Sequence, residues 1–291
     1  MPRSPFPLIP ATQLTSDTAA QAVLRRHHVQ VVGTGQPLLF CSGFNCDQQV
    51  WHYLTPALAS QYQLIFFDQL GVGQSDRTAY DAQKYATFAG YAQDVVDICR
   101  ALELHEAVLV GHSAGALVAM LAAIEGPQYV ARTVLLAASP HYLNEPGYYG
   151  GFERADLLAI VAEMHANYAR WASTFATMLI GQYDAPALSH ELVECATKAD
   201  PRLARHIMQL VFLGDFRSLL PRLQVPTLLL QCTDDPAVPE EVSAYMLAHL
   251  PHATLVTLGT SGHSPHLTAP AEVVAAIRHF LQPAFQPLAA R

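Results

Sequence analysis

A serine between small residues stands at the junction of two apolar segments. The pentapeptide 111–115 reads Gly-His-Ser-Ala-Gly, which matches the pattern Gly-x-Ser-x-Gly, and it follows the apolar run 107–111. The next stretch, 114–124, has the small and aliphatic side chains of a buried helix. On a sharp strand-to-helix turn, a serine is held out at the edge of a sheet, where it can attack a substrate. We therefore predict Ser113 as a nucleophile rather than part of an inert turn. Its neighbour His112 is expected to be a packing or surface residue rather than a catalytic one.

A serine hydroxyl needs a base to take its proton, usually a histidine that a carboxylate holds in place. With this type of turn, the chain order is serine, then aspartate or glutamate, then histidine. Asp234 and Asp235 follow a predicted strand over 225–232. His263 and His266 follow the last predicted strand. The residues alone leave two choices open, since either aspartate could be the acid and either histidine the base.

The charged oxygen that forms during acyl transfer needs two backbone donors, which together make an oxyanion hole. One is the amide that follows the nucleophile, that of Ala114. The other is expected in the loop 41–46, where Phe44 is the predicted donor. Cys41 and Cys46 in this loop could suggest a metal or redox site, but nothing else in the sequence has metal-ligand spacing. The sequence implies no metal and no organic cofactor.

Strands and helices alternate around these residues, which favours a mostly parallel sheet with helices on both faces, an α/β fold. The predicted strands span 23–33, 37–41, 62–68, 107–111, 132–138, 225–232 and 253–258. The predicted helices of the alternating part span 87–104, 114–124, 240–250 and 271–281. Residues 141–222 break this rhythm, because they show helical spacing and no strand signal. They are predicted to form an all-helical insertion.

The domain organisation follows from this pattern. Residues 23–140 and 223–291 are predicted to form one α/β core, and 141–222 a helical cap. The first 22 residues contain four prolines and lack the continuous apolar run of a signal peptide. They are expected to form a flexible N-terminal arm.

Composition narrows the class of protein. Of the 291 residues, 51% are hydrophobic and 14% charged, which is typical of a globular protein. The net charge is −8 and there is no basic run, which disfavours nucleic-acid and membrane partners. The five cysteines are odd in number and scattered, so we expect reduced thiols and a cytoplasmic location.

Several stretches resemble the α/β-hydrolase superfamily, and within it the RsbQ-like group, which includes a bacterial stress regulator and plant receptors for strigolactones and karrikins. The Gly-x-Ser-x-Gly turn, called the nucleophile elbow, is common to very many hydrolases. The Gly-Phe-x-x-Asp-Gln and Tyr-Leu-Asn stretches are more specific to this group. The stretches that carry the resemblance are SGFNCDQQVW (42–51), FFDQLGVGQSD (66–76), YAQDVVDICRAL (91–102), VGHSAGALVAMLA (110–122), SPHYLNEPGYYGGFE (139–153), LQCTDDPAVP (230–239) and GHSPHLTAP (262–270).

The resemblance implies a site. It makes Ser113 the nucleophile, Asp235 the acid and His263 the base. It also matches Phe44 and Ala114 to the oxyanion donors, although Ser42 stands where many relatives have a histidine. In this group a V-shaped cap of four helices is inserted after the sixth strand and covers an apolar pocket. The aromatic residues expected on those helices, which either line the pocket or pack between cap and core, are Trp171, Phe175 and Phe212.

The resemblance also implies a function. The expected reaction is hydrolysis of a small hydrophobic ester or lactone through an acyl-enzyme. The alternative is a signalling protein that binds or slowly hydrolyses such a ligand and acts through a regulatory protein partner.

Overall fold

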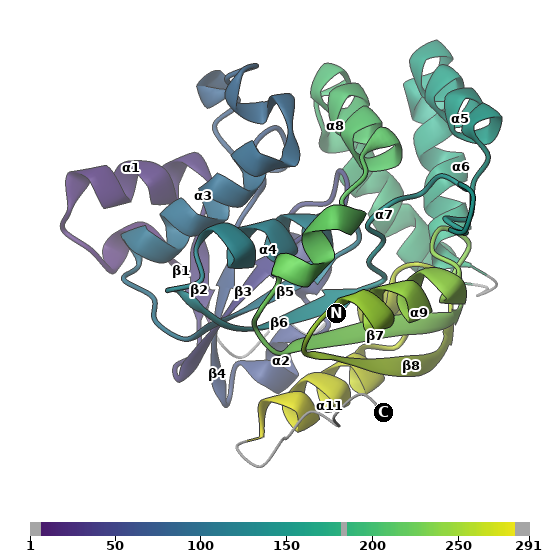
Figure 1. Cartoon of the computed structure of the whole chain (residues 1–291). Helices are drawn as coiled ribbons and strands as arrows, with labels where there is room; N and C mark the ends of the chain where they lie inside the picture. The colour runs from purple at the N-terminus through teal and green to yellow at the C-terminus, as the bar shows by residue number, and fades with distance from the viewer. Residues whose placement is uncertain (1–6, 182–184, 283–291) are drawn as a thin grey trace.

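The structure is a computed structural model that describes residues 7–181 and 185–282 of the chain. In these residues one sheet of eight strands crosses the molecule, in the order β1-β2-β4-β3-β5-β6-β7-β8 (Figure 1). β1 and β2 are antiparallel to their neighbours, and all other neighbours pair in parallel, as expected for this fold. The strands are β1 (Ile9–Pro10), β2 (Gln30–Val32), β3 (Gln36–Cys41), β4 (Tyr62–Phe66), β5 (Ala107–His112), β6 (Val130–Leu136), β7 (Thr227–Asp234) and β8 (Ala253–Ser261).

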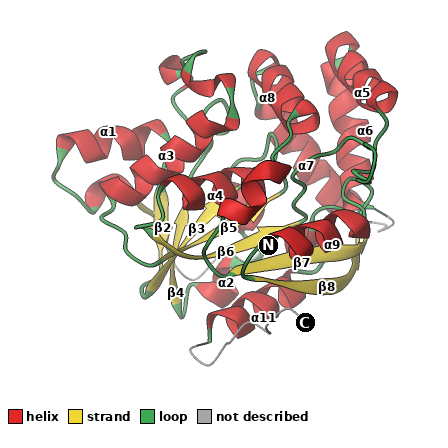
Figure 2. Cartoon of the chain, viewed as in Figure 1, coloured by secondary structure: helices red, strands yellow, loops and turns green. Residues whose placement is uncertain are grey.

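Helices cover both faces of the sheet (Figure 2). Successive strand residues point to opposite faces, so Leu39 and Leu38 belong to two separate apolar clusters. The cluster of Leu39 includes residues of α1 (Thr18–Arg26), α3 (Phe88–Ala101), α4 (Ala114–Glu125) and α9 (Glu240–His249). The cluster of Leu38 includes residues of α2 (Thr55–Leu58) and α11 (Pro270–Leu281). No helix in the described ranges is long and apolar enough to cross a membrane.

Short helices lie in the connecting segments. They are η1 (Ala11–Gln13), η2 (Gln48–Trp51), η3 (Arg77–Ala79), η4 (Lys84–Ala86), η5 (Arg217–Arg222) and α10 (Pro265–Thr268). Of these, α10 begins directly after the loop that carries His263.

Four α-helices lie between β6 and β7 in the described residues, and they stand together above one end of the sheet (Figure 1). They are α5 (Arg154–Ala166), α6 (Tyr168–Ile180), α7 (Pro186–Lys198) and α8 (Pro201–Leu213), and we call them the cap helices. Their first member α5 packs against α6 and α8, while α6 also packs against α7. The insertion therefore follows the sixth strand, where the sequence predicted it.

The beginning of the chain differs from the prediction. The strand expected over 23–33 is wrong in its first part, because α1 runs to Arg26 and only Gln30–Val32 form a strand. The buried residues Ala20 and Leu24 are four apart, which is the spacing of one helical face. The described part of the expected flexible arm also contains β1, which pairs with β2. Residues 1–6 of that arm and 283–291 of the expected core lie outside the described residues.

Candidate active site

Ser113 lies in the sharp turn between β5 and α4. Its backbone has φ 52° and ψ −120°, a conformation that costs a non-glycine residue about 1–3 kcal/mol. The flanking glycines allow strand and helix to approach closely. A Cβ on Gly111 would lie 2.5 Å from the carbonyl oxygen of Gly115, and one on Gly115 would lie 2.2 Å from that of Cys41. The local sequence therefore explains why the chain can present a serine here.

A side chain from a distant segment contacts Ser113, and a second distant side chain contacts the first. Nε2 of His263 lies 2.7 Å from Oγ of Ser113, although 150 residues separate them in the chain. On the other side of the ring, Nδ1 of His263 lies 2.8 Å from Oδ2 of Asp235. A carboxylate only accepts hydrogen bonds, so Nδ1 carries the proton and Nε2 is free to accept from the serine hydroxyl. In this arrangement Asp235 holds the ring of His263, and His263 can accept the hydroxyl proton of Ser113.

The geometry distinguishes the aspartates and histidines that the residues left open. The side chain of Asp235 is 0% exposed, and its Oδ1 accepts hydrogen bonds from the amides of Ala237 and Val238. Asp234 is exposed at the end of β7. His266 is buried against the ring of Trp51, with ring centroids 4.7 Å apart. Ser113, His263 and Asp235 therefore form the hydrogen-bonded chain, as the resemblance implied.

Two backbone amides beside Ser113 are available as donors. Ala114 is the first residue of α4, and its amide has no hydrogen-bond partner in the described residues. The amide of Phe44, in the loop after β3, likewise has none in that part of the chain. Close packing of β3 on the turn brings the two loops together, since Gly115 lies directly against the backbone of Cys41. This is the setting that an oxyanion hole requires.

A narrow cavity of about 30 Å³ lies over Ser113. Its walls combine the loop after β3, the cap helices and the segments that carry Ser113 and His263. Most of the lining side chains are apolar, so the cavity suits a hydrophobic group. The lining residues are Phe44, Cys46, His112, Ser113, Tyr142, Phe175, Leu179, Leu192, Met208, Val211, Phe212, Ala237, His263 and Ser264.

The three aromatic residues expected in the pocket have different positions. Phe175 and Phe212 line the cavity, as predicted. Trp171 does not line it, and that prediction is wrong. Its ring is stacked on Phe175, with centroids 4.9 Å apart, and it meets the ring of Phe44 edge-on at 6.0 Å. Trp171 is thus buried in a second layer, where it supports the two rings that face the cavity.

Tyr142 is a lining residue that the sequence analysis did not single out. It follows β6 near the carboxyl edge of the parallel sheet, where sites in such folds are built. Burial raises the pKa of its hydroxyl, and the neighbouring hydroxyl of Ser113 partly offsets that rise. Its position after a predicted strand was the only signal in the sequence that pointed to it.

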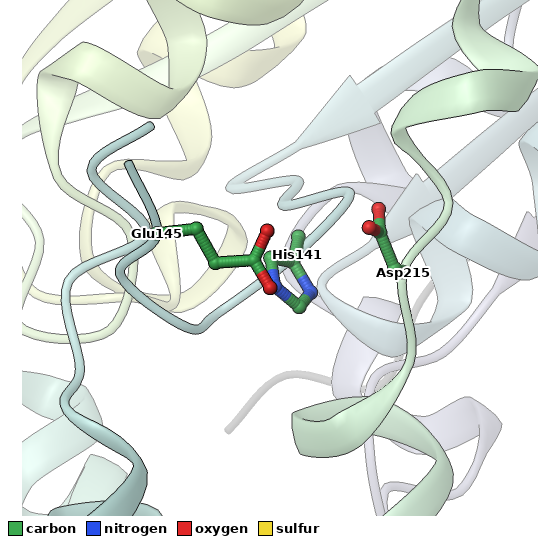
Figure 3. A group of neighbouring side chains, drawn as sticks. All are labelled: His141, Glu145 and Asp215. Carbon is green, nitrogen blue, oxygen red and sulfur yellow. The ribbon is translucent and has the colours of Figure 1, made fainter. Parts of the chain in front are cut away.

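One cluster in the described residues has the side chains of a metal site. His141, Glu145 and Asp215 offer ligand atoms within 4.8 Å of one another (Figure 3). However, Nη2 of Arg217 lies 2.6 Å from a carboxylate oxygen of both Glu145 and Asp215. Hydrogen bonds from Arg217 lower the pKa of both carboxyl groups, so this guanidinium already supplies the positive charge. We assign no metal to the cluster, which instead joins the segments that enter and leave the cap.

The fold is that of an α/β hydrolase, and Ser113 lies on the sharp turn between β5 and α4. Residues 38–276 match the alpha/beta hydrolase family. The chain therefore belongs to this family, and it is an α/β-hydrolase enzyme.

Similar proteins include plant receptors and esterases. A karrikin insensitive 2 receptor from Petunia hybrida is 36% identical over 251 residues, which cover 85% of this chain and 93% of the relative. A strigolactone esterase from Arabidopsis thaliana is 33% identical over 89% of this chain and 97% of its own length. Among solved structures, a hydrolase from Oleispira antarctica has a TM-score of 0.89 and 32% identity, over 91% of this chain and 97% of that protein.

Proposed function

We propose that this protein hydrolyses small hydrophobic esters or lactones through an acyl-enzyme on Ser113. The observation that carries this proposal is the continuous hydrogen-bonded chain from Asp235 through His263 to Ser113, with distances of 2.8 Å and 2.7 Å. The apolar cavity above the serine supports a hydrophobic substrate. The relatives named as esterases support the reaction class.

The first half of the reaction forms the acyl-enzyme. Oγ of Ser113 attacks the carbonyl carbon while Nε2 of His263 takes the hydroxyl proton. The carbonyl oxygen becomes negatively charged and accepts hydrogen bonds from the amides of Phe44 and Ala114. Asp235 stabilises the imidazolium. The bond to the leaving oxygen then breaks, and His263 returns its proton to the departing alcohol.

The second half releases the acid. A water molecule gives a proton to Nε2 of His263 and attacks the acyl carbon, which passes through a second charged tetrahedral species in the same oxyanion hole. The bond to Oγ of Ser113 breaks and the serine regains its proton from the imidazolium. In a lactone the leaving alcohol stays attached to the acyl group, so a single hydroxy acid is released.

A second candidate function is signalling. The similarity to a karrikin receptor over most of the chain favours it, because the same triad would then bind or slowly cleave a small hydrophobic ligand. In this role the cap would present a surface to a regulatory protein, as in the RsbQ-like group. The two functions differ in how the acyl-enzyme behaves, since a sensor retains it and an esterase releases it.

We also propose a cytoplasmic location. The five cysteines are unpaired in the structure, and four of them are buried. Reduced thiols are typical of a reducing compartment.

The experiment is a progress curve with p-nitrophenyl acetate, followed from milliseconds to an hour, with an intact mass measured at the end. A sustained linear rate that is lost in Ser113→Ala supports the esterase. A burst of about one equivalent followed by a lasting acyl adduct on Ser113 supports the sensor. Unchanged hydrolysis by folded Ser113→Ala would overturn the proposed nucleophile, and with it both functions.

A further inference from the structure

His112, the residue before the nucleophile, contacts the backbone of the catalytic base. Its Nε2 lies 2.7 Å from the carbonyl oxygen of His263, and the residue is only 4% exposed. A carbonyl oxygen only accepts, so Nε2 of His112 carries a proton and donates it. The last residue of β5 therefore contacts the loop after β8, although β6 and β7 lie between these two strands in the sheet.

The other edge of the same ring meets the oxyanion loop. Because Nε2 carries the proton, Nδ1 of neutral His112 is bare, and it has no hydrogen-bond partner in the described residues. A Cβ built on Gly43 would lie 2.6 Å from this Nδ1. Gly43 precedes Phe44, whose amide is the proposed oxyanion donor. The imidazole therefore separates two loops that must both be placed correctly around Ser113.

His112 does not act as a proton carrier in this position. Burial, and then the neighbouring rings of His266 and His263, lower its pKa well below the ordinary histidine value. The ring of His266 lies 4.4 Å from it, centroid to centroid, and that of His263 lies at 5.2 Å. A neutral ring in fixed contact with its neighbours can position them, but it supplies no charge to the reaction.

We propose that His112 is a positioning residue, which holds the backbone of His263 on one side and sets the distance of the Phe44 loop on the other. This inference rests on the proposed function, since the two loops matter only if His263 is the base and Phe44 an oxyanion donor. Positioning is worth much in catalysis, because a displacement of about 1 Å costs roughly 100-fold in rate.

The first test compares two substitutions of His112. His112→Ala removes the donor and the ring, and we expect kcat to fall roughly 10-fold to 100-fold with little change in KM. The acid limb of the kcat/KM profile should move to lower pH, because a displaced His263 is less well stabilised by Asp235. His112→Gln keeps an N–H donor near the position of Nε2. This variant should therefore have most of the native kcat and the native acid limb of the kcat/KM profile.

The second test is a double-mutant cycle with Gly43. The φ angle of Gly43 is not in the left-handed region, so an alanine there meets no backbone strain. Its Cβ would instead clash with the ring of His112. We expect Gly43→Ala to lower kcat roughly 10-fold in the native background and to have little further effect in His112→Ala, where the space is open. Strictly additive losses would overturn the role of His112 at the oxyanion loop.

Thermal unfolding and Ser113→Ala serve as controls. The role of His112 would be packing alone if both variants kept the native kcat and the native acid limb of the pH profile. In that case His112→Gln should lose as much melting temperature as His112→Ala. Native kinetics in folded His112→Ala would also overturn the proposal. Activity that survives in Ser113→Ala, by contrast, would show that the proposed function itself is wrong.

Discussion

The backbone amide of His263 donates a hydrogen bond of 2.7 Å to the carbonyl oxygen of Leu179, in the last turn of cap helix α6. The preceding Gly262 packs equally closely on the cap, because a Cβ there would lie 2.4 Å from the carbonyl oxygen of Ile180. The base of the proposed triad is thus held between the sheet and the cap. Movement of α6 would therefore move His263, so the position of the cap affects the position of the proposed base.

Gly262→Ala tests this contact. We expect kcat to fall roughly 10-fold to 100-fold, since the new Cβ must push the loop of His263 away from α6. Gly147→Ala is a matched control, because Gly147 has a similar positive φ of 81° but nothing within 4 Å of the added Cβ. The control should lose about 1 kcal/mol of unfolding free energy and keep its kcat. Equal kinetics in the two variants would show that the cap contact does not position the base.

Asp235→Asn should reduce kcat by roughly 10³-fold to 10⁴-fold, because an amide no longer stabilises the charged imidazole and favours the wrong tautomer of His263. Asp234→Asn is the control, since its carboxylate is exposed and does not contact His263. It should keep nearly native kcat. Steady-state kinetics on one activated ester at about pH 8 separate the two aspartates, and the reverse pattern would assign the acid to Asp234.

The narrow cavity predicts a preference for short acyl groups. In a series of p-nitrophenyl esters from acetate to octanoate, kcat/KM should be highest for acetate and fall as the acyl chain lengthens. The cavity of about 30 Å³ has the volume of about one water molecule, so each added methylene requires more movement of the cap. Phe175→Ala should shift the optimum to longer chains. Leu158→Ala, on the exposed side of α5, should leave the profile unchanged. A flat profile in the native protein would show that the cap opens freely.

Acid should destabilise the fold through His266. Burial, and then the neighbouring His263 and His52, lower its pKa to about 3, whereas an unfolded histidine titrates near 6.5. Below about pH 6.5 the unfolded chain therefore binds a proton that the folded chain does not, so stability falls as the pH drops. From about pH 7.5 to 5 this residue alone should remove about 2 kcal/mol.

Denaturant unfolding at several pH values checks this. His266→Phe keeps a ring on Trp51 and should weaken the pH dependence by that amount. The contribution of His112, whose pKa is also lowered by burial, should remain. His105→Gln, at an exposed position, should leave the pH dependence as it is. The expectation fails if His266→Phe unfolds with the native pH dependence.

The sequence by itself determined the features that depend on neighbouring residues. The Gly-x-Ser-x-Gly turn, the alternation of strands and helices and the helical insertion before residue 223 are local patterns, set by backbone sterics and by the period of apolar side chains. The first strand was misjudged because short apolar segments fit both periods. The helix that forms there begins after Asp17, whose side chain caps α1 by accepting a hydrogen bond from the amide of Ala19.

Only the tertiary structure decided which side chains meet. Asp234 and Asp235 are adjacent in the chain, but the turn after β7 directs Asp235 to His263 and leaves Asp234 in solvent. The position of Trp171 behind Phe175 and Phe44, and that of His112 between two loops, depend on contacts between segments far apart in sequence. Such contacts depend on how the sheet, loops and cap pack together. The spacing of residues along one sequence does not predict that packing.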